Sequence, residues 1–193
     1  MSDIIGLPAS ALSSLKAELR AASWFAALGE PLTDGDRIDA TAYATALGGP
    51  DVTIDVARGW PEAEHFLKAP DWSPHWWDRE EALRLDLLKR AETRHSERAL
   101  WTGLTELTTE IGEVVHGKAA TAAARMGDAA RASIHVAAGA ASQAAYQLAV
   151  ARLAGEPASA FESKFRLFAA GGGRPGSPWP SPVPFWGERR RQA

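Results

Sequence analysis

Three of the five histidines follow a glutamate by three positions, at Glu62/His65, Glu92/His95 and Glu113/His116. Residues three apart share one face of a helix, so a carboxylate and an imidazole at this spacing can reach the same ion or the same substrate atom. Two kinds of chemistry use such a pair. One is coordination of a divalent metal, and the other is proton transfer by a histidine that a carboxylate orients.

The metal hypothesis uses the second and third pairs. Glu62 lies in the first turn after Pro61, where the helix dipole alone favours a carboxylate. We therefore take Glu92, His95, Glu113 and His116 as the candidate metal ligands, and iron, manganese or zinc as the candidate ion. The spacing is similar to that of carboxylate dimetal bundles. The similarity covers a few residues only, and the matched set of four helices is not evident, so no property of that family is transferred.

The helix that carries these pairs decides whether they can meet. Residues 76–126 contain no proline. If they form one straight helix, positions 92 and 113 are about 31 Å apart and cannot share a metal. If the chain folds back near Gly103, the two pairs lie at the same level. The apolar rhythm of Leu100, Leu104, Leu107, Ile111 and Val114 passes through Gly103 without interruption, which favours the single helix.

A polar block, residues 89–98 (KRAETRHSER), interrupts the apolar stripes of this segment. It supplies candidates for a site without a metal. The candidate catalytic residues are Glu92, His95 and Tyr146. The candidate substrate-binding residues are Arg94, Arg98, His135, Gln143 and Trp76. His135 and Tyr146 fall with Ser142 on one helical face, and arginines beside a histidine can hold a carboxylate or a phosphate. The simpler interpretation is a solvated row, in which Glu80 pairs with Arg84 and Asp86 with Arg90.

The elements that must position these residues are helices. Alanine accounts for 39 residues and β-branched residues are few, a composition that favours closely packed helices. Periodicity and capping residues predict helices at 9–28, 39–47 and around Phe161, Phe165 and Phe168. Gly127-Asp128 predicts a hairpin followed by a helix at 129–154. Residues 51–56 (DVTIDV) alternate like a strand but have no partner, which favours an extended linker. The prediction is an all-α bundle of five to seven helices.

The C-terminal segment differs from the rest. Residues 171–193 are rich in glycine, proline and tryptophan and predict a non-helical, Pro-rich extension, whereas residues 1–170 form a single all-α domain. The extension is either a strap across the bundle, held by Trp179, Phe185 and Trp186, or a ligand for a partner protein. Four further tryptophans (Trp60, Trp72, Trp76 and Trp77) are expected to wedge short helices onto the bundle, or to form an aromatic wall around a ligand.

The composition of the chain excludes several classes of functional site and of protein. With no cysteine, disulfides, thiolate catalysis and Cys-ligated metals are excluded, and a net charge of −3 gives a nucleic-acid surface no overall support. No run of apolar residues is long enough to span a membrane, and the first residues lack the features of a signal peptide, so we expect a soluble cytoplasmic protein. Gly-rich phosphate loops, HExxH and G-x-S-x-G motifs are not found.

Two functional hypotheses remain open. The first is a small helical-bundle enzyme or ligand-binding protein with a polar pocket among its helices, which uses acid–base or metal-assisted chemistry on a small molecule. The second is a non-catalytic interaction or assembly protein, in which the Ala-rich face and the Pro-rich tail are contact surfaces and the chain forms a homo-oligomer. The sequence does not decide whether the protein is an enzyme.

Overall fold

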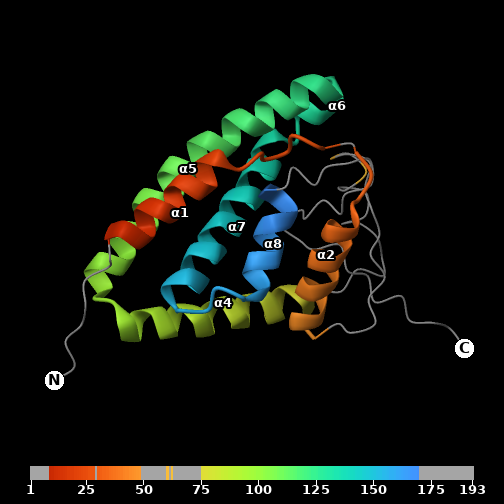
Figure 1. The fold of residues 1–193 in the computed structure, drawn as a ribbon. Helices are drawn as coiled ribbons and strands as arrows, with labels where there is room; N and C mark the ends of the chain where they lie inside the picture. Colours follow the sequence, from red (N-terminus) through yellow and green to blue (C-terminus); the bar gives the residue numbers. More distant parts are fainter. Residues whose placement is uncertain (1–8, 29, 49–59, 61, 63–74, 170–193) are drawn as a thin grey trace, which may run out of the picture.

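Helices make up the architecture of the protein, as predicted. The computed structural model describes residues 9–28, 30–48, 60, 62 and 75–169. Within these residues seven helices are found and no strand, and they pack as an all-α bundle (Figure 1). They are α1 (Ala9–Ala21), α2 (Asp34–Ala46), α4 (His75–Arg94), α5 (Glu97–Met126), α6 (Asp128–Arg131), α7 (Ile134–Leu153) and α8 (Ala160–Ala169).

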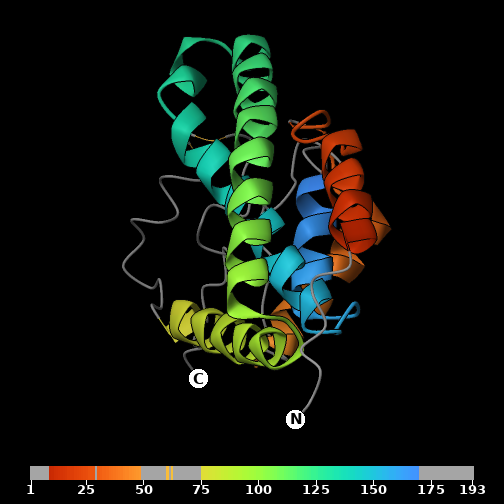
Figure 2. The same cartoon turned by 90° about the vertical axis from the view of Figure 1, so that its left-hand side faces the viewer.

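The long central segment is not one helix. It breaks between Arg94 and Glu97, where Ser96 takes an extended conformation and its hydroxyl accepts a bond from the Ala99 amide. The expectation of a single helix through residues 76–126 is therefore wrong, and the chain does not fold back at Gly103 either. Instead α4 and α5 meet at a corner, and α4 runs across the base of α5 (Figure 2). The polar block at 89–98 contains this helix end and the next helix start.

The predicted hairpin at Gly127 is confirmed. Gly127 has a φ of 95°, a conformation that favours glycine, and it ends α5. The single helix expected at 129–154 is instead the short α6 followed by α7. Alanines of α5 and α7 are buried where the two helices pack together along most of their length. Small side chains allow this close approach, because the distance between helix axes depends on the side chains in the contact.

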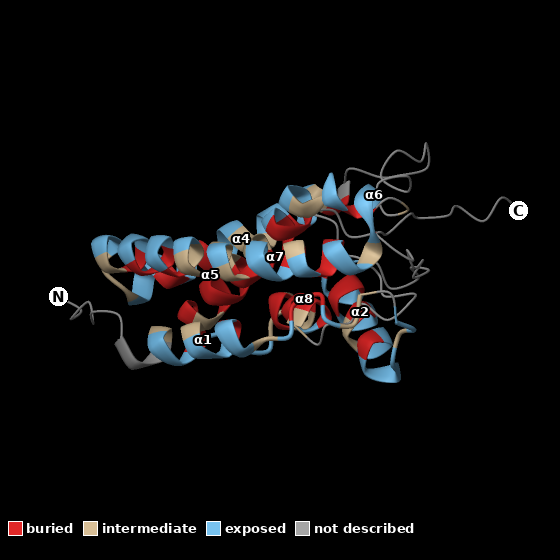
Figure 3. Ribbon diagram, turned by 90° about the horizontal axis from the view of Figure 1, so that it is seen from above, coloured by how far each residue is buried: buried red, intermediate tan, exposed pale blue. Residues whose placement is uncertain are grey.

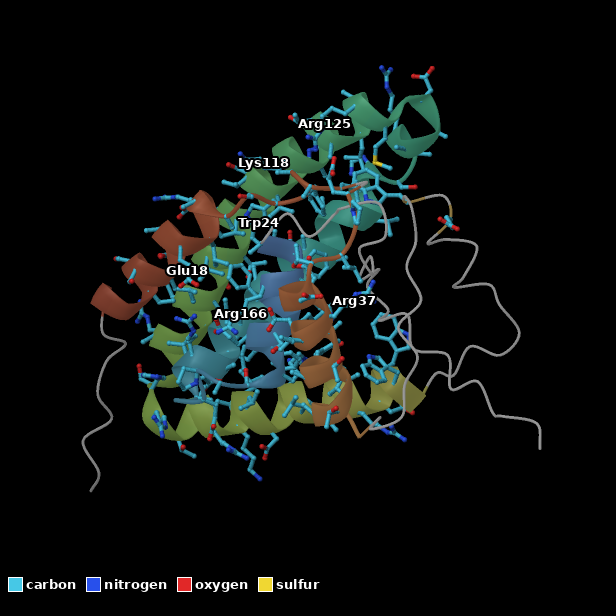
Figure 4. The ribbon with its side chains drawn as sticks, turned by 45° about the vertical axis from the view of Figure 1, so that its right-hand side comes forward. Glu18, Trp24, Arg37, Lys118, Arg125 and Arg166 are labelled. Carbon is cyan, nitrogen blue, oxygen red and sulfur yellow. The ribbon has the colours of Figure 1, made fainter. Side chains whose placement is uncertain are left out.

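Two helix boundaries differ from the prediction. The first helix ends at Ala21 instead of residue 28, and Trp24 and Phe25 then turn into the core. Arg125 of α5 holds this turn by donating to the carbonyls of Phe25 and Ala26, at 2.8 and 3.0 Å (Figure 4). Helix α2 begins five residues earlier than expected.

The start of α2 is set by a capping box. The Thr33 hydroxyl accepts from the Asp36 amide, and the Asp36 carboxylate accepts from the Thr33 amide. Asp39, which we expected to be the cap, lies inside the helix. Gly48 has a φ of 80° and follows the last turn, as predicted.

Buried side chains form two apolar clusters. The main cluster joins α1, α4, α5, α7 and α8, whose buried faces turn toward one another (Figure 3). A smaller cluster lies under α2 and contains Ala40, Tyr43, Ala44, Leu47, Trp76 and Leu167. The phenylalanines of α8, at 161, 165 and 168, are buried in the main cluster, as their spacing predicted.

Some expectations concern other parts of the chain. The linker at 51–56, Trp72 and the extension at 171–193 lie outside the described residues, so the domain boundary and the choice between strap and partner ligand stay predictions. Among the helices that are described, not one combines the length and the apolar character needed to cross a membrane.

Candidate functional site

A cluster of polar side chains from four helices is buried in the protein. Tyr43 comes from α2, Glu80 from α4, Gln147 from α7 and Lys164 from α8. Each side chain belongs to a residue that is at most 2% exposed. We call this set the Glu80 cluster. Ionised residues are almost never fully buried unless they are paired, so the charged members of the cluster are expected to have partners in the core.

Local helix geometry places the two charges in the core. Glu80 is one turn after the buried Trp76 and two turns before the buried Leu87, so it lies on the apolar stripe of α4. Lys164 lies on the stripe of α8, three residues after Phe161 and four before Phe168. Both charges are therefore carried inward by the burial of the apolar residues around them.

The carboxylate of Glu80 is the centre of the cluster. Its Oε1 accepts from Lys164 Nζ at 2.7 Å and from Gln147 Nε2. Its Oε2 accepts from the Tyr43 hydroxyl. Lys164 Nζ also lies 5.7 Å from the centroid of the Tyr43 ring, within the range of a cation–π contact. Three donors, one of which is the Lys164 cation, offset part of the cost of burying the carboxylate.

Burial alters the ionisation of two members. The pKa of the Lys164 ammonium is lowered by burial, and Glu80 opposes this only in part. The pKa of the Tyr43 hydroxyl is raised well above its usual value, first by burial and then by the neighbouring Glu80 carboxylate. A lysine with a lowered pKa gives up its proton more readily than a solvated lysine. Lys164 is therefore the member of the cluster best suited to proton transfer.

One acceptor in the cluster is open. Gln147 Oε1 is buried and has no hydrogen-bond partner among the described residues. Buried polar atoms are nearly always paired, so an open acceptor is a place where a ligand or a water could bind.

The cluster also bridges the two apolar clusters. Tyr43 belongs to the smaller one, and Leu148 and Phe165, next to Gln147 and Lys164, belong to the main one.

Three predicted site residues flank the Glu80 cluster. Trp76 is buried, and its ring packs edge-on against Tyr43 with a centroid separation of 5.7 Å. Gln143 is half-buried on α7, one turn before Gln147. Tyr146 is half-buried and accepts from Arg84 at 3.4 Å. Trp76 was expected to bind substrate and Tyr146 to be catalytic, and neither role is tested by this placement.

The pairing expected for Arg84 is wrong. Arg84 pairs with the exposed Glu81, which holds the pKa of the Glu81 carboxyl below its usual value, while Glu80 turns inward. The second expected pair is present, with Arg90 2.7 Å from Asp86.

The polar block at 89–98 joins α4 to the end of α7. Nε2 of His95 is 3.0 Å from the carbonyl oxygen of Leu153. A carbonyl can only accept, so Nε2 carries the proton, and Nδ1 is left without a partner within the described structure. Arg94 lies against Gly155, where a Cβ would collide with its guanidinium. Glu92 and Arg98 are exposed. Glu92 is about 18 Å along α4 from Glu80.

The four candidate metal ligands are not brought together. Glu92 and His95 are at the end of α4, whereas Glu113 and His116 lie some five turns into α5. No group of three or more His, Asp or Glu side chains arranged to hold a metal occurs in the described part of the chain. His116 is instead beside His135 of α7, with ring centroids 5.1 Å apart.

Sequence reasoning missed the Glu80 cluster, although a signal for it exists. A lysine among three phenylalanines at helical spacing, and a glutamate one turn after a tryptophan, place opposite charges on apolar stripes. A charged side chain buried on such a stripe is costly unless it pairs with an opposite charge in the core. The comparisons with known proteins add no relative: no family model, no curated protein and no solved structure matches the chain.

Proposed function

We propose that the protein binds a small zwitterionic molecule at the Glu80 cluster. The observation that carries this proposal is a buried ion pair from two helices, Glu80 and Lys164, beside the open acceptor Gln147 Oε1. Sites of this kind are typically found between the helices of bundles, with a few polar groups set in apolar surroundings.

The charges specify the class of ligand. A ligand that enters between Glu80 and Lys164 must replace the partner that each one loses, because an uncompensated buried charge is costly. An ammonium group on the ligand would pair with Glu80, and a carboxylate would pair with Lys164. A further N–H of the ligand would reach Gln147 Oε1. Amino acids and their short homologues carry this combination in a few atoms.

Helix α2 is the element that would have to yield for a ligand to enter. It packs mainly on α8, and its Tyr43 covers the carboxylate from the side of the smaller apolar cluster. Besides the smaller apolar cluster, which includes Trp76 of α4, polar links hold α2 in place: Asp39 lies 3.6 Å from Arg166, and Arg79 donates to the carbonyls of Leu47 and Gly48. Such links break at a smaller cost than the main apolar cluster.

Proton transfer is the reaction that this site could add to binding. Because burial lowers the pKa of Lys164, its ammonium can give a proton to a bound carboxylate more readily than a solvated lysine can, and the resulting amine can take that proton back. Glu80 would stabilise the charged form of the lysine. We therefore propose Glu80 and Lys164, in place of Glu92 and His95, as the acid–base residues. Tyr146 lies near the cluster and is given no role in this step.

The test is thermal unfolding with glycine and β-alanine as zwitterions and acetate and methylamine as singly charged probes, at low millimolar concentration. Binding to the folded state raises Tm. We expect a zwitterion to raise Tm in the natural chain and in the Glu81→Gln variant, and to leave Tm unchanged in the Glu80→Gln variant. Glu81 is next to Glu80 but exposed, so it controls for the loss of charge.

Two outcomes would overturn the proposal. The first is that neither zwitterion raises Tm in the natural chain. The second is that the Glu80→Gln variant responds as strongly as the natural chain, which is the behaviour of a solute acting on the whole surface.

The assembly hypothesis has less in its favour. The alanines of α7, which were to form a contact surface, pack inside the chain. Among the residues that the structure describes, the large exposed apolar ones are Ile38, Leu85, Trp101 and Val136. They lie on four different helices, and single apolar residues on a surface are ordinary. We therefore do not adopt assembly as the function, and the homo-oligomer and the cytoplasmic location stay predictions.

A further inference from the structure

We propose that His116 and His135 form a surface site for a divalent transition-metal ion that clamps α5 to α7. The imidazole rings come from the two arms of the Gly127 hairpin, and their centroids are 5.1 Å apart with an angle of 41° between the ring planes. Both residues are exposed, so an ion can reach them from solvent.

The separation of the rings fits a shared metal. A zinc–nitrogen bond is about 2.0–2.1 Å, and two imidazoles bound to one tetrahedral ion therefore place their centroids about 5 Å apart. Two neutral imidazoles in this arrangement gain no obvious stabilisation from each other, and their protonated forms repel. A cation between them converts the arrangement into an attraction.

The supporting helices make the site stiff. Helices α5 and α7 are the most extensively packed pair among the described elements. They also approach closely further from the hairpin, where a Cβ added at Gly112 would come within 3.9 Å of Ser142 Oγ. Side chains on two packed helices lose little freedom when they bind an ion, so preorganisation favours binding.

The donor set identifies the class of ion. Imidazole nitrogen suits zinc, copper and nickel, whereas magnesium and calcium prefer oxygen. With two protein ligands, the remaining positions would be filled by water or by an added ligand. Glu113, one turn before His116, is not arranged as a third ligand, because no three-residue group is found within the described residues. His135 thus takes the place that the sequence pattern gave to Glu113.

The test uses the full chain, freed of metal with a chelator and titrated with zinc by calorimetry. We expect one zinc per chain in the natural protein. His116→Ala and His135→Ala should each weaken affinity at least as much as the roughly tenfold loss caused by removing an outer partner of a metal-bound histidine. The double variant should bind no more weakly than either single variant, because both ligands act as one unit. Glu113→Gln, on the same exposed face, is the matched control and should keep the natural affinity.

A second measurement separates this site from the other histidines. The copper(II) ion is paramagnetic, and at substoichiometric copper the ring resonances of His116 and His135 should broaden before that of His95, whose Nε2 is occupied by Leu153. Zinc should also raise Tm in the natural chain and not in either histidine variant. The proposal is overturned if the natural chain binds no zinc, if the His135→Ala variant keeps the natural zinc affinity, or if Glu113→Gln loses as much affinity as His135→Ala.

Discussion

Removing Lys164 from the Glu80 cluster is the sharpest test of how the core is held together. The change is Lys164→Met, which keeps much of the aliphatic stem and deletes the charge. Residues Lys164 and Glu80 are 1% and 2% exposed, so solvent does not screen their interaction. Breaking a buried pair by removing one partner costs about 3–5 kcal/mol, because the other charge is left uncompensated. Tyr43 and Gln147 still donate to Glu80, which places the expected loss near the lower end.

A double variant separates the pair from its parts. In Glu80→Gln/Lys164→Met both charges are gone, and Gln at position 80 can still accept from Tyr43. Neutral replacement of a buried ion pair is often tolerated, so we expect the double variant to be more stable than Lys164→Met alone. The same cycle on the exposed pair Asp86 and Arg90, also on α4, should show a coupling of at most about 0.5 kcal/mol.

The assay is urea unfolding followed by circular dichroism and tryptophan fluorescence, with the slope m checked for constancy across the variants. In a chain of this size a loss of about 3 kcal/mol corresponds to a fall in Tm of about 6–12 °C. The reasoning is refuted if Lys164→Met costs less than about 1 kcal/mol, or if the two single changes add within error. Either result would mean that water reaches the pair and that the cluster is not sealed.

Three further predictions follow from the described contacts. Tyr43→Phe should reduce the fall in the free energy of unfolding at alkaline pH. The raised pKa of Tyr43 contributes stability that is full below its usual pKa of 10.0 and is lost as pH rises toward its pKa in the folded protein. Urea midpoints between pH 9 and about 11 check this, and an unchanged alkaline fall would contradict it. In the metal-free protein, His95→Ala should cost about 1–3 kcal/mol by removing the bond to Leu153, whereas the exposed His116→Ala should stay within about 0.5 kcal/mol, both by urea unfolding. Thr33→Ala should cost about 0.5–2 kcal/mol through loss of the α2 cap, and amide exchange in the first turn of α2 should show where it acts.

The residues around the end of α4 show what helical periodicity in the sequence can and cannot predict. The spacing of Glu92 and His95 predicted that both lie on one helix, but α4 ends at Arg94, and His95, one residue later, donates to the carbonyl of Leu153. A serine that could cap α5 was present at position 96. The apolar rhythm around Gly103 carried no information about a corner eight residues earlier, because a helix break between two amphipathic segments leaves both stripes intact.

The sequence by itself determined the all-α class, the hairpin at Gly127 and the buried face of α8. These depend on interactions between residues a few positions apart, namely alanine propensity, a glycine with positive φ and phenylalanines at a spacing of three and four. The tertiary structure alone decided which polar side chains meet. Glu80 and Lys164 are 84 positions apart, on helices whose packing no local pattern specifies. His116 and His135 are 19 apart, and the glycine signal at Gly127 predicts a hairpin but not which residues of its two arms meet. Partners for buried charges are chosen by packing, and packing is a property of the whole chain.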